Sequence, residues 1–458
     1  MNRQMLLALG CLMLLAGWMS AFLYRSLPQS SDIYYLVPTL LLAVGMGLVL
    51  KIVSGRLTAV VLALTAVASI MAVNAFYPSK GLTLLGIQKK MQSVKIGNPL
   101  TMQVREADRA DLFSEELKLE SFADIEINLF TQTPGPARML AFDSVGNLLV
   151  SIPKLDAIYL FRDKDRDGYS DQAQLFSVNL DRPHGLVWQQ DRLYVAETAR
   201  LLELRDTDGD MKADQSRVIL EGLPDDGGHW TRSLAMGADG LLYLSVGSRC
   251  NACEEQDKRR ATILRVNPAT GHSEVHATGL RNSVGLVFDA EGQNLWASDN
   301  GRDSLGEDLP PDEINRIVAG GNYGWPYCFG AQRPDPELAN QAVCRETLSS
   351  AVDLQAHSAP LGIVFGDQLA APLEYRNSLF VAYHGSWNRR VPTGYKLVRI
   401  PFVNGQPAGK AEEFLSGWLV DGQAWGRPVA PVVGPDGALY LSDDRANAIY
   451  RIRWKTQE

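Results

Sequence analysis

Leu241-Leu-Tyr-Leu-Ser245 is one copy of a short pattern that recurs six times along residues 147–442. Each copy is an apolar, often aromatic run that ends in Ser or Ala. Short runs of this composition predict buried β-strands. Every copy has leucine at its second position, and these leucines are Leu148, Leu193, Leu242, Leu295, Leu379 and Leu439.

The spacing of the copies predicts a β-propeller. Units of roughly 40–50 residues, rich in short strands and Gly/Asp turns, are typical of propeller blades. We therefore predict an all-β fold over residues 122–458, a six-bladed β-propeller. A β-sandwich with a recurrent hairpin is the alternative, which six copies at mostly similar spacing disfavour. The widest gap predicts an insertion over about residues 303–356, of the kind that builds a site on one face.

Composition divides the chain into two parts. Its 458 residues carry a net charge of -8, with 46% hydrophobic and 21% charged residues, which disfavours a disordered chain and a basic nucleic-acid binder. The almost uncharged N-terminal part contains apolar runs of about the ~20 residues that span a bilayer. We expect a membrane domain of three transmembrane α-helices in residues 1–78, followed by a linker, residues 79–121. The three runs are Met5–Tyr24, Tyr34–Val53 and Leu57–Phe76.

Basic residues near these runs predict the orientation. Arg3 precedes the first run, and Lys51 and Arg56 lie between the second and third. Alternating helices place these residues on one side, which the positive-inside rule assigns to the cytoplasm. We therefore expect a multi-pass protein of a bacterial inner membrane, with its soluble domain in the periplasm.

Four of the five cysteines form two local groups, Cys250 with Cys253 and Cys328 with Cys344. An even number of cysteines in short loops of an exported domain predicts two disulfides. A zinc site is the alternative, but the separation of the groups and the lack of nearby histidines disfavour it. No covalent haem motif follows Cys253.

Three histidines adjoin a predicted blade strand or its leading loop: His184, His229 and His384. If they converge on a central pocket, one of them has the near-neutral pKa that suits proton abstraction from an alcohol. Arg281 offers a planar fork for carboxylates or quinone oxygens, although a surface salt bridge is the alternative.

Oxygen-rich turns suggest calcium. Gly-rich and acidic segments occur at residues 298–302, 311–316 and 320–326, and alternating aspartates precede glycine at residues 163–168 and 206–210. Calcium prefers such carbonyl and carboxylate oxygens. Ordinary tight turns explain all five segments equally well, and the closing glutamate of an EF-hand is missing from the last two.

Several motifs together resemble the glucose/sorbosone dehydrogenase family of quinoprotein propellers, which use pyrroloquinoline quinone (PQQ). The resemblance extends from about residue 122 to the C-terminus, and two further motifs resemble the sorbosone dehydrogenase-like branch. The family motifs are Gly228–Arg232, Leu242–Gly247, Gly279–Asn282, Asp312–Asn315 and Gly321–Pro326, and the branch motifs are Cys250–Glu254 and Gly426–Val429.

The resemblance implies roles for individual residues. His229 falls at the catalytic base, which takes the proton of a sugar hydroxyl while hydride passes to the C5 carbonyl of PQQ. The positions that contact the cofactor are His184, Arg281, Asn282 and Arg427. The backbone carbonyls of Gly301 and Arg302 fall at the cofactor's Ca²⁺, and Glu313 and Tyr323 fall at a second, structural Ca²⁺.

Two positions depart from the family pattern. An acidic residue of the strand after the catalytic histidine is replaced by Ser248, and the family's PQQ-binding lysine has no match near His384. The leading expectation is a membrane-anchored PQQ-dependent sugar dehydrogenase that oxidises an aldose or a sorbosone-like sugar and passes electrons to a respiratory quinone or a cytochrome. The alternatives are a non-catalytic propeller that binds a glycan or a protein, and a lactonase-like propeller with a metal held by carboxylates at the channel.

Overall fold

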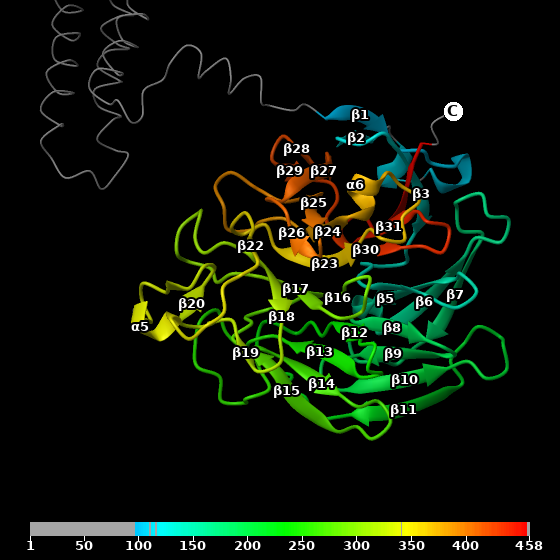
Figure 1. Ribbon diagram of the computed structural model, residues 1–458. Helices are drawn as coiled ribbons and strands as arrows, with labels where there is room; N and C mark the ends of the chain where they lie inside the picture. Colours follow the sequence, from blue (N-terminus) through cyan, green and yellow to red (C-terminus); the bar gives the residue numbers. More distant parts are fainter. Residues whose placement is uncertain (1–96, 110, 115–116, 340, 456–458) are drawn as a thin grey trace, which may run out of the picture. The chain divides into compact units, whose positions relative to one another are not determined.

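The computed structural model describes residues 97–109, 111–114, 117–339 and 341–455 (Figure 1). The chain divides into two units, Met1–Ile96 and Gly97–Glu458, and the described residues all belong to the second. The three predicted transmembrane helices lie outside the described residues. Among the residues described, no helix is both long enough and apolar enough to cross a membrane.

Antiparallel sheets arranged around a centre build the second unit, which confirms the predicted all-β propeller (Figure 1). The described residues contain six sheets of four or more strands. From the innermost strand outward, the first three are β4 (Leu140–Phe142), β5 (Leu148–Ile152), β6 (Ala157–Arg162) and β7 (Gln172–Ser177); β8 (Leu186–Gln189), β9 (Arg192–Ala196), β10 (Leu201–Arg205) and β11 (Gln215–Leu220); and β12 (Leu234–Met236), β13 (Leu242–Val246), β14 (Thr262–Val266), β15 (Ser273–Thr278) and β19 (Gly321–Asn322).

The other three sheets continue the same arrangement. They are β16 (Gly285–Phe288), β17 (Leu295–Asp299), β18 (Glu313–Ile317) and β22 (Val352–Asp353); β23 (Pro360–Phe365), β24 (Ser378–Tyr383), β25 (Lys396–Val403) and β27 (Glu412–Ser416), with β26 (Gln406–Pro407) on β25; and β30 (Pro428–Val433), β31 (Leu439–Asp443), β32 (Ala448–Trp454) and β3 (Ile125–Gln132).

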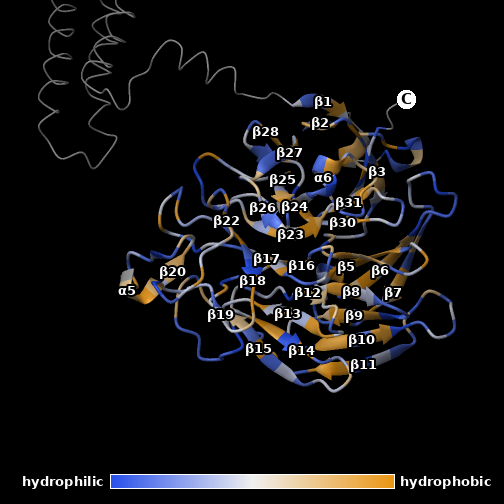
Figure 2. Cartoon of the chain, viewed as in Figure 1, coloured by the Kyte–Doolittle hydropathy of each residue, from blue (hydrophilic) through white to orange (hydrophobic). Residues whose placement is uncertain are grey.

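The recurrent apolar pattern forms the second strand of each sheet. In β13 all five residues are buried, because neighbouring sheets cover both of its faces. Alternate residues of one strand therefore enter different cores: Leu295 packs toward β13 and β14, whereas Trp296 packs toward β24 and β25. The outer strand β11 is mostly exposed. Figure 2 shows the same trend, with β9 and β10 largely apolar and the outer loops largely polar.

Contacts between the innermost strands close the ring. Each of β4, β8, β12, β16, β23 and β30 packs against the next, and β30 returns to β4. The strand before the first repeat, β3, pairs with the last strand of the chain, β32, so the two ends of the propeller share one sheet. Along the axis runs a channel of about 180 Å³, lined by these six strands and their flanking residues.

Part of the predicted linker also belongs to the propeller. β1 (Asn98–Thr101) pairs with β2 (Lys118–Ser121), and β2 pairs with β27. Leu119 and Phe113 are buried in the core of this sheet, which explains why the segment packs there. The short helices of the described chain are η2 (Glu106–Asp108), η3 (Asp111–Ser114), η4 (Pro153–Leu155), α5 (Gln341–Cys344) and α6 (Leu373–Arg376).

The predicted insertion is only partly an insertion. β18 and β22, which lie within residues 303–356, are regular third and fourth strands of their sheet. The true excursion lies between them and carries β19, α5 and a small hairpin, β20 (Cys328–Phe329) with β21 (Arg333–Pro334). A second small hairpin, β28 (Leu419–Val420) with β29 (Gln423–Ala424), precedes β30.

Candidate functional site

The residues that immediately precede the innermost strands meet at one end of the channel. Hydrogen bonds join these segments from sheet to sheet: Gly185 N–H donates to Arg232 O at 2.8 Å, and Ser233 Oγ donates to Val284 O. His184, His229, Asn282 and Arg427 all lie in such segments, before β8, β12, β16 and β30. Since each second strand runs antiparallel to the first, its C-terminal end returns to the same place. The fold thus gathers the predicted cofactor and catalytic residues around one channel mouth.

Ser248, which follows β13, determines the tautomer of His229. The Nδ1 atom of His229 lies 3.0 Å from Ser248 O and 2.8 Å from Ser248 Oγ, and Ser248 Oγ donates to Cys250 O at 2.8 Å. A carbonyl can only accept, so Nδ1 carries the proton. The lone pair of Nε2 is then free to accept a proton, as a general base requires.

Burial is the main reason that the pKa of His229 is lowered from 6.5 to about 4, and the positive charge of Arg281 adds to the effect. His229 is therefore neutral at pH 7. Ser248, which stands where the family pattern has an acid, accepts the hydrogen bond of His229 Nδ1 without a negative charge. No carboxylate therefore contacts Nδ1 to raise the pKa of His229.

Gly247 separates His229 from Asn282. A Cβ atom at Gly247 would lie 2.7 Å from His229 Cβ and 2.9 Å from Asn282 Oδ1, closer than such atoms approach in proteins. The absence of a side chain at Gly247 lets the base and the amide stand on either side of the same backbone segment.

We expect Gly247→Ala to push His229 and Asn282 apart and to lower the rate of a reaction that uses His229 as its base by ~10²-fold, the cost of a misplacement of about 1 Å. Steady-state kinetics with an artificial dye acceptor measures the change. Gly409→Ala, at a glycine with open space around it and no positive φ, is the control and should leave the rate unchanged. Full activity of Gly247→Ala would contradict the packing described here.

Arg281 is nearly buried, with 5% of its surface exposed, and burial lowers the pKa of its guanidinium. Its side chain donates to Asn251 O, Asn251 Oδ1, Asn300 O and Asp303 Oδ2. The backbone N–H groups of Arg281 and Asn282 donate to Asp299, at 3.0 and 2.8 Å. Asp299 thereby fixes the backbone that presents both predicted cofactor residues.

Arg427 reaches the mouth from the opposite side of the ring. Its Nε and Nη2 atoms donate to His384 O and Gly385 O, at 3.0 and 2.8 Å. These carbonyls leave the positive charge of Arg427 unneutralised. The partly buried guanidinium of Arg427 and the buried guanidinium of Arg281, which also contacts Asp303, fit an anionic ligand such as the three carboxylates of PQQ.

His184 and His384 are linked through an ion pair that sequence reasoning missed. Arg138 Nη1 donates to Asp444 at 2.7 Å and Arg138 Nη2 lies 3.4 Å from His184 Nε2. His384 Nε2 lies 2.8 Å from the other oxygen of Asp444. Burial lowers the pKa of His384 to about 4 and that of His184 well below its usual range, whereas His384 and Arg138 keep the pKa of Asp444 low. Both histidines are thus neutral at pH 7.

The four predicted metal ligands line one small cavity, together with Arg281, Asp299 and Asp335. The cavity has a volume of about 20 Å³, room for one water or a bare cation. Gly301 N–H donates to Asp312, and the Arg302 side chain donates to Asp335. The Tyr323 hydroxyl donates to Arg316 O. Gly301, Arg302 and Tyr323 can therefore offer carbonyl oxygens only.

Glu313 supplies one carboxylate of this cavity, beside those of Asp299 and Asp335. It accepts from Gly330 N and from Asn315 Nδ2, and the buried Asn315 Oδ1 has no hydrogen-bond partner. Burial, together with the charge of Asp299, raises the pKa of Glu313 to about 7. Carboxylates and backbone carbonyls are the oxygen donors that Ca²⁺ takes, and here they would offset the positive charges of Arg281 and Arg302, which line the same cavity. The structure brings together residues that sequence analysis had divided between two calcium sites.

Both predicted disulfides are confirmed, Cys250–Cys253 and Cys328–Cys344. The two aspartate-rich segments form the loops of the outer hairpins β6–β7 and β10–β11. In each loop the first aspartate accepts backbone N–H groups of its own turn, Asp163 from Gly168 and Asp206 from Gly209. Calcium binding at these loops stays a prediction.

One signal in the sequence could have identified Arg138. It stands two residues before the first residue of its innermost strand, as His184 does before β8 and Arg232 before β12. No comparable signal marks Asp444, because its partner Arg138 is 306 positions away in the chain.

Comparisons with known proteins identify the family of the propeller. The TrAA12-like family matches residues 123–455. An uncharacterised protein of Borreliella burgdorferi is 31% identical over 361 residues, which cover 76% of this chain and 93% of that protein. The PQQ-dependent pyranose dehydrogenase of Coprinopsis cinerea is 25% identical over 69% of this chain, and the chain spans about half (52%) of its length.

Solved structures share the fold. The family AA12 enzyme of Trichoderma reesei has a TM-score of 0.65 and 22% identity, and the match covers 74% of this chain and 98% of that one. The PQQ domain of the Coprinopsis cinerea enzyme, solved in its holo form, has a TM-score of 0.64 and 21% identity, with 74% and 97% covered. With its match over most of the propeller, this chain belongs to the TrAA12-like family, whose relatives include PQQ-dependent sugar dehydrogenases.

Proposed function

We propose that this protein is a PQQ-dependent dehydrogenase that oxidises an aldose or a sorbosone-like sugar. The observation that carries the proposal is the orientation of His229. Its Nδ1 atom is held by Ser248, and Asn282 lies across Gly247 from it. A neutral imidazole with a free Nε2, at a channel mouth that also carries Arg281 and Arg427, suits the oxidation of a hydroxyl next to an anionic cofactor. We count the six sheets as the blades of a six-bladed propeller.

Each residue of the mouth has a separate role in this proposal. His229 Nε2 removes the proton of the sugar hydroxyl that is being oxidised. Arg281, Arg427, Asn282 and His184 hold the cofactor and orient it toward that hydroxyl. PQQ, when bound, supplies the acceptor for the hydride of the sugar. Gly301, Arg302, Glu313 and Tyr323, which line one cavity, would together hold a single Ca²⁺.

The full chain, purified with its N-terminal segment, tests the proposal directly. Titration with PQQ and Ca²⁺ should shift the quinone absorbance, and aldoses should then reduce an artificial dye. A series of aldoses and sorbosone-like sugars would identify the substrate class. Failure of PQQ to bind at any concentration would overturn the proposal. It would favour a non-catalytic propeller that binds a glycan or protein, which is supported by Ser248 at the position where the family pattern has an acid. The lactonase-like alternative lacks support, because none of the described residues that line the channel is a carboxylate.

The lowered pKa of His229 predicts the acid limb of the pH profile. A base acts only when neutral, so kcat/KM should stay level from pH 7 to 5 and fall tenfold per unit below about pH 4. An unperturbed histidine would give the same fall below pH 6.5. Ser248→Asp should move the limb upward, because a carboxylate at Nδ1 stabilises the imidazolium. A limb that does not respond to Ser248→Asp would exclude His229 as the titrating base.

Calcium should stabilise the protein through Glu313. A ligand that binds only the folded state adds about 2.7 kcal/mol at 100 times its Kd, so Ca²⁺ should raise the Tm of the wild type. Glu313→Gln removes the charge and should abolish this rise. Glu374→Gln, at an exposed glutamate of α6, is the matched control and should keep the rise. A Ca²⁺ effect of equal size in the Glu313 variant would argue against this cavity.

We also propose that residues 1–78 form three helices in a bacterial inner membrane, with the propeller in the periplasm. Two disulfides support an oxidising compartment. A respiratory quinone or a cytochrome would then accept the electrons. A reporter that is active only in the periplasm, fused to the C-terminus, tests the orientation, and activity of a cytoplasm-only reporter would refute it.

A further inference from the structure

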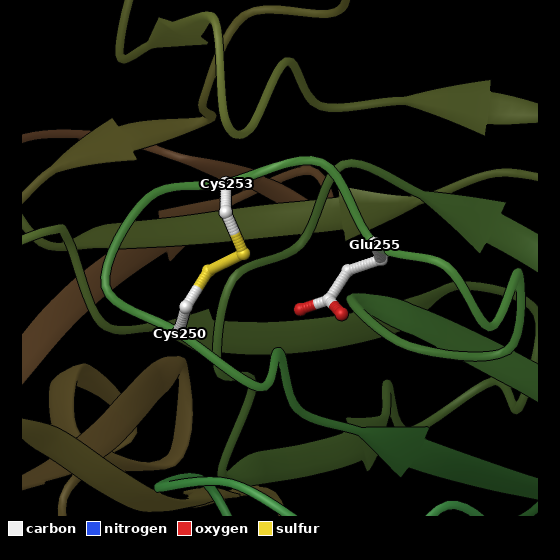
Figure 3. Close-up of side chains that lie close together, drawn as sticks. All are labelled: Cys250, Cys253 and Glu255. Atoms are coloured by element: carbon white, nitrogen blue, oxygen red, sulfur yellow. A yellow bond between two sulfur atoms is a disulfide. The ribbon is translucent and has the colours of Figure 1, made fainter.

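The loop Cys250–Cys253 lies beside the candidate site and is closed by a disulfide (Figure 3). Its backbone continues directly from Ser248, the residue that orients His229. Within the loop, Asn251 contacts residues from three other segments of the site, which are Arg281, Asp303 and Trp325. The proposed reaction assigns this asparagine no role.

Asn251 holds one edge of the Arg281 guanidinium with two acceptor atoms. Asn251 O accepts from Arg281 Nε at 2.9 Å, and Asn251 Oδ1 accepts from Arg281 Nη2 at 2.9 Å. A single residue thus supplies both acceptors for one edge of the planar fork, which is the geometry that fixes a guanidinium in its plane and in its direction.

The same asparagine is itself fixed by neighbours. Asn251 Oδ1 accepts from Asp303 N at 2.7 Å, and Asn251 Nδ2 donates to Asp303 O at 3.1 Å. The indole of Trp325 donates to Asn251 O at 3.2 Å. These contacts tie the loop to the turn after β17 and to the excursion after β18, so the position of Arg281 depends on three segments that meet at Asn251.

The disulfide restricts the loop further. It joins the residues on either side of Asn251 and Ala252, so the backbone at Asn251 cannot open independently. Cys250 O also accepts a hydrogen bond from Ser248 Oγ, and the same Oγ is hydrogen-bonded to His229 Nδ1. The cross-linked loop therefore contacts Ser248, which orients His229, and it also contacts Arg281 directly.

We propose that Asn251 is a positioning residue that aims Arg281 at the anionic cofactor, and that the Cys250–Cys253 disulfide holds Asn251 in place. This inference rests on the proposed function for the identity of the ligand. By orienting Arg281, the loop would take part in binding a polycarboxylate, in addition to stabilising the fold.

A double-mutant cycle on the full chain tests the inference, with PQQ affinity measured by the quinone absorbance. Asn251→Ala should weaken PQQ binding about tenfold, as loss of a partner that orients a ligand-binding group does. In an Arg281→Ala background the same change should have no further effect. Cys250→Ala with Cys253→Ala should cause a smaller loss that also disappears in that background.

The control is Asn294→Ala, which removes another asparagine that accepts from an arginine, Arg316, on the outside of the propeller. It should leave PQQ affinity unchanged. An unchanged affinity in Asn251→Ala, or an equal loss in both backgrounds, would overturn the inference. A loss in the cysteine variant that persists without Arg281 would overturn the role of the disulfide.

Crystal structures of the cofactor-free wild type and Asn251→Ala separate this inference from the proposed function. Displacement of the Arg281 side chain in the variant would support the positioning role of Asn251, whether or not the wild type binds PQQ. Failure of the wild type to bind PQQ would refute only the proposed function. An unmoved Arg281 would refute the inference. If Asn251→Ala does not fold, Asn251→Asp is the alternative variant. It keeps both oxygen atoms that accept from Arg281, so the Arg281 side chain should stay in place. A displaced Arg281 side chain in Asn251→Asp would count against Asn251 as the residue that positions it.

Discussion

His229→Ala is expected to lower kcat for sugar oxidation by ~10²–10⁴-fold, the usual contribution of a positioned general base. Nε2 of His229 is the free nitrogen, since Nδ1 donates to Ser248, and alanine offers no group that can accept the hydroxyl proton. PQQ affinity should change little, because Arg281 and Arg427 keep their contacts. Stopped-flow measurement of dye reduction, together with a PQQ titration of the same variant, gives the two quantities separately.

His272→Ala is the control for this prediction. His272 lies in the exposed loop between β14 and β15, away from the channel mouth, and its loss should leave kcat unchanged. A His229 variant that loses PQQ affinity but keeps kcat once the cofactor is saturating would reverse the assignment, and His229 would then be a cofactor ligand instead of the base.

The propeller could be predicted because its second strands are buried on both faces. Such strands must be apolar at every position, as β13 is, and therefore stand out as short continuous runs. Outer strands give no such signal: β11 is mostly exposed and reads as polar loop. β1 and β2 were assigned to a linker for the same reason, since Leu119 is the main apolar anchor of their short pairing.

The candidate site could be predicted only in part. His229, Arg281 and Arg427 belong to local motifs, and the resemblance to a family carried their roles. The contacts that orient them are long-range. Arg138 and Asp444 are 306 positions apart, and Asn251 reaches Asp303 across 52 positions, so neither pair leaves a spacing that can be read from the chain. Burial, which lowers the pKa of His229, is likewise a property of the assembled mouth.

Arg281→Ala is the second prediction with a large expected effect. A hydrogen bond to a charged group contributes about 1.5–3 kcal/mol, so PQQ affinity should fall by roughly 10- to 100-fold. The same change should also shift the pH profile. The positive charge of Arg281 helps to lower the pKa of His229, so its removal should raise that pKa and move the acid limb of kcat/KM above pH 4.

The two effects of Arg281→Ala must occur together, because one guanidinium causes both. Arg259→Ala removes a half-buried arginine that pairs with Asp257 and is not among the charges that act on His229, and should change neither PQQ affinity nor the acid limb. Weaker binding with an unmoved limb would mean that Arg281 holds the cofactor but does not act on His229. A moved limb with unchanged affinity would remove Arg281 from the cofactor site and leave the ligand's carboxylates to Arg427, whose guanidinium donates only to carbonyls.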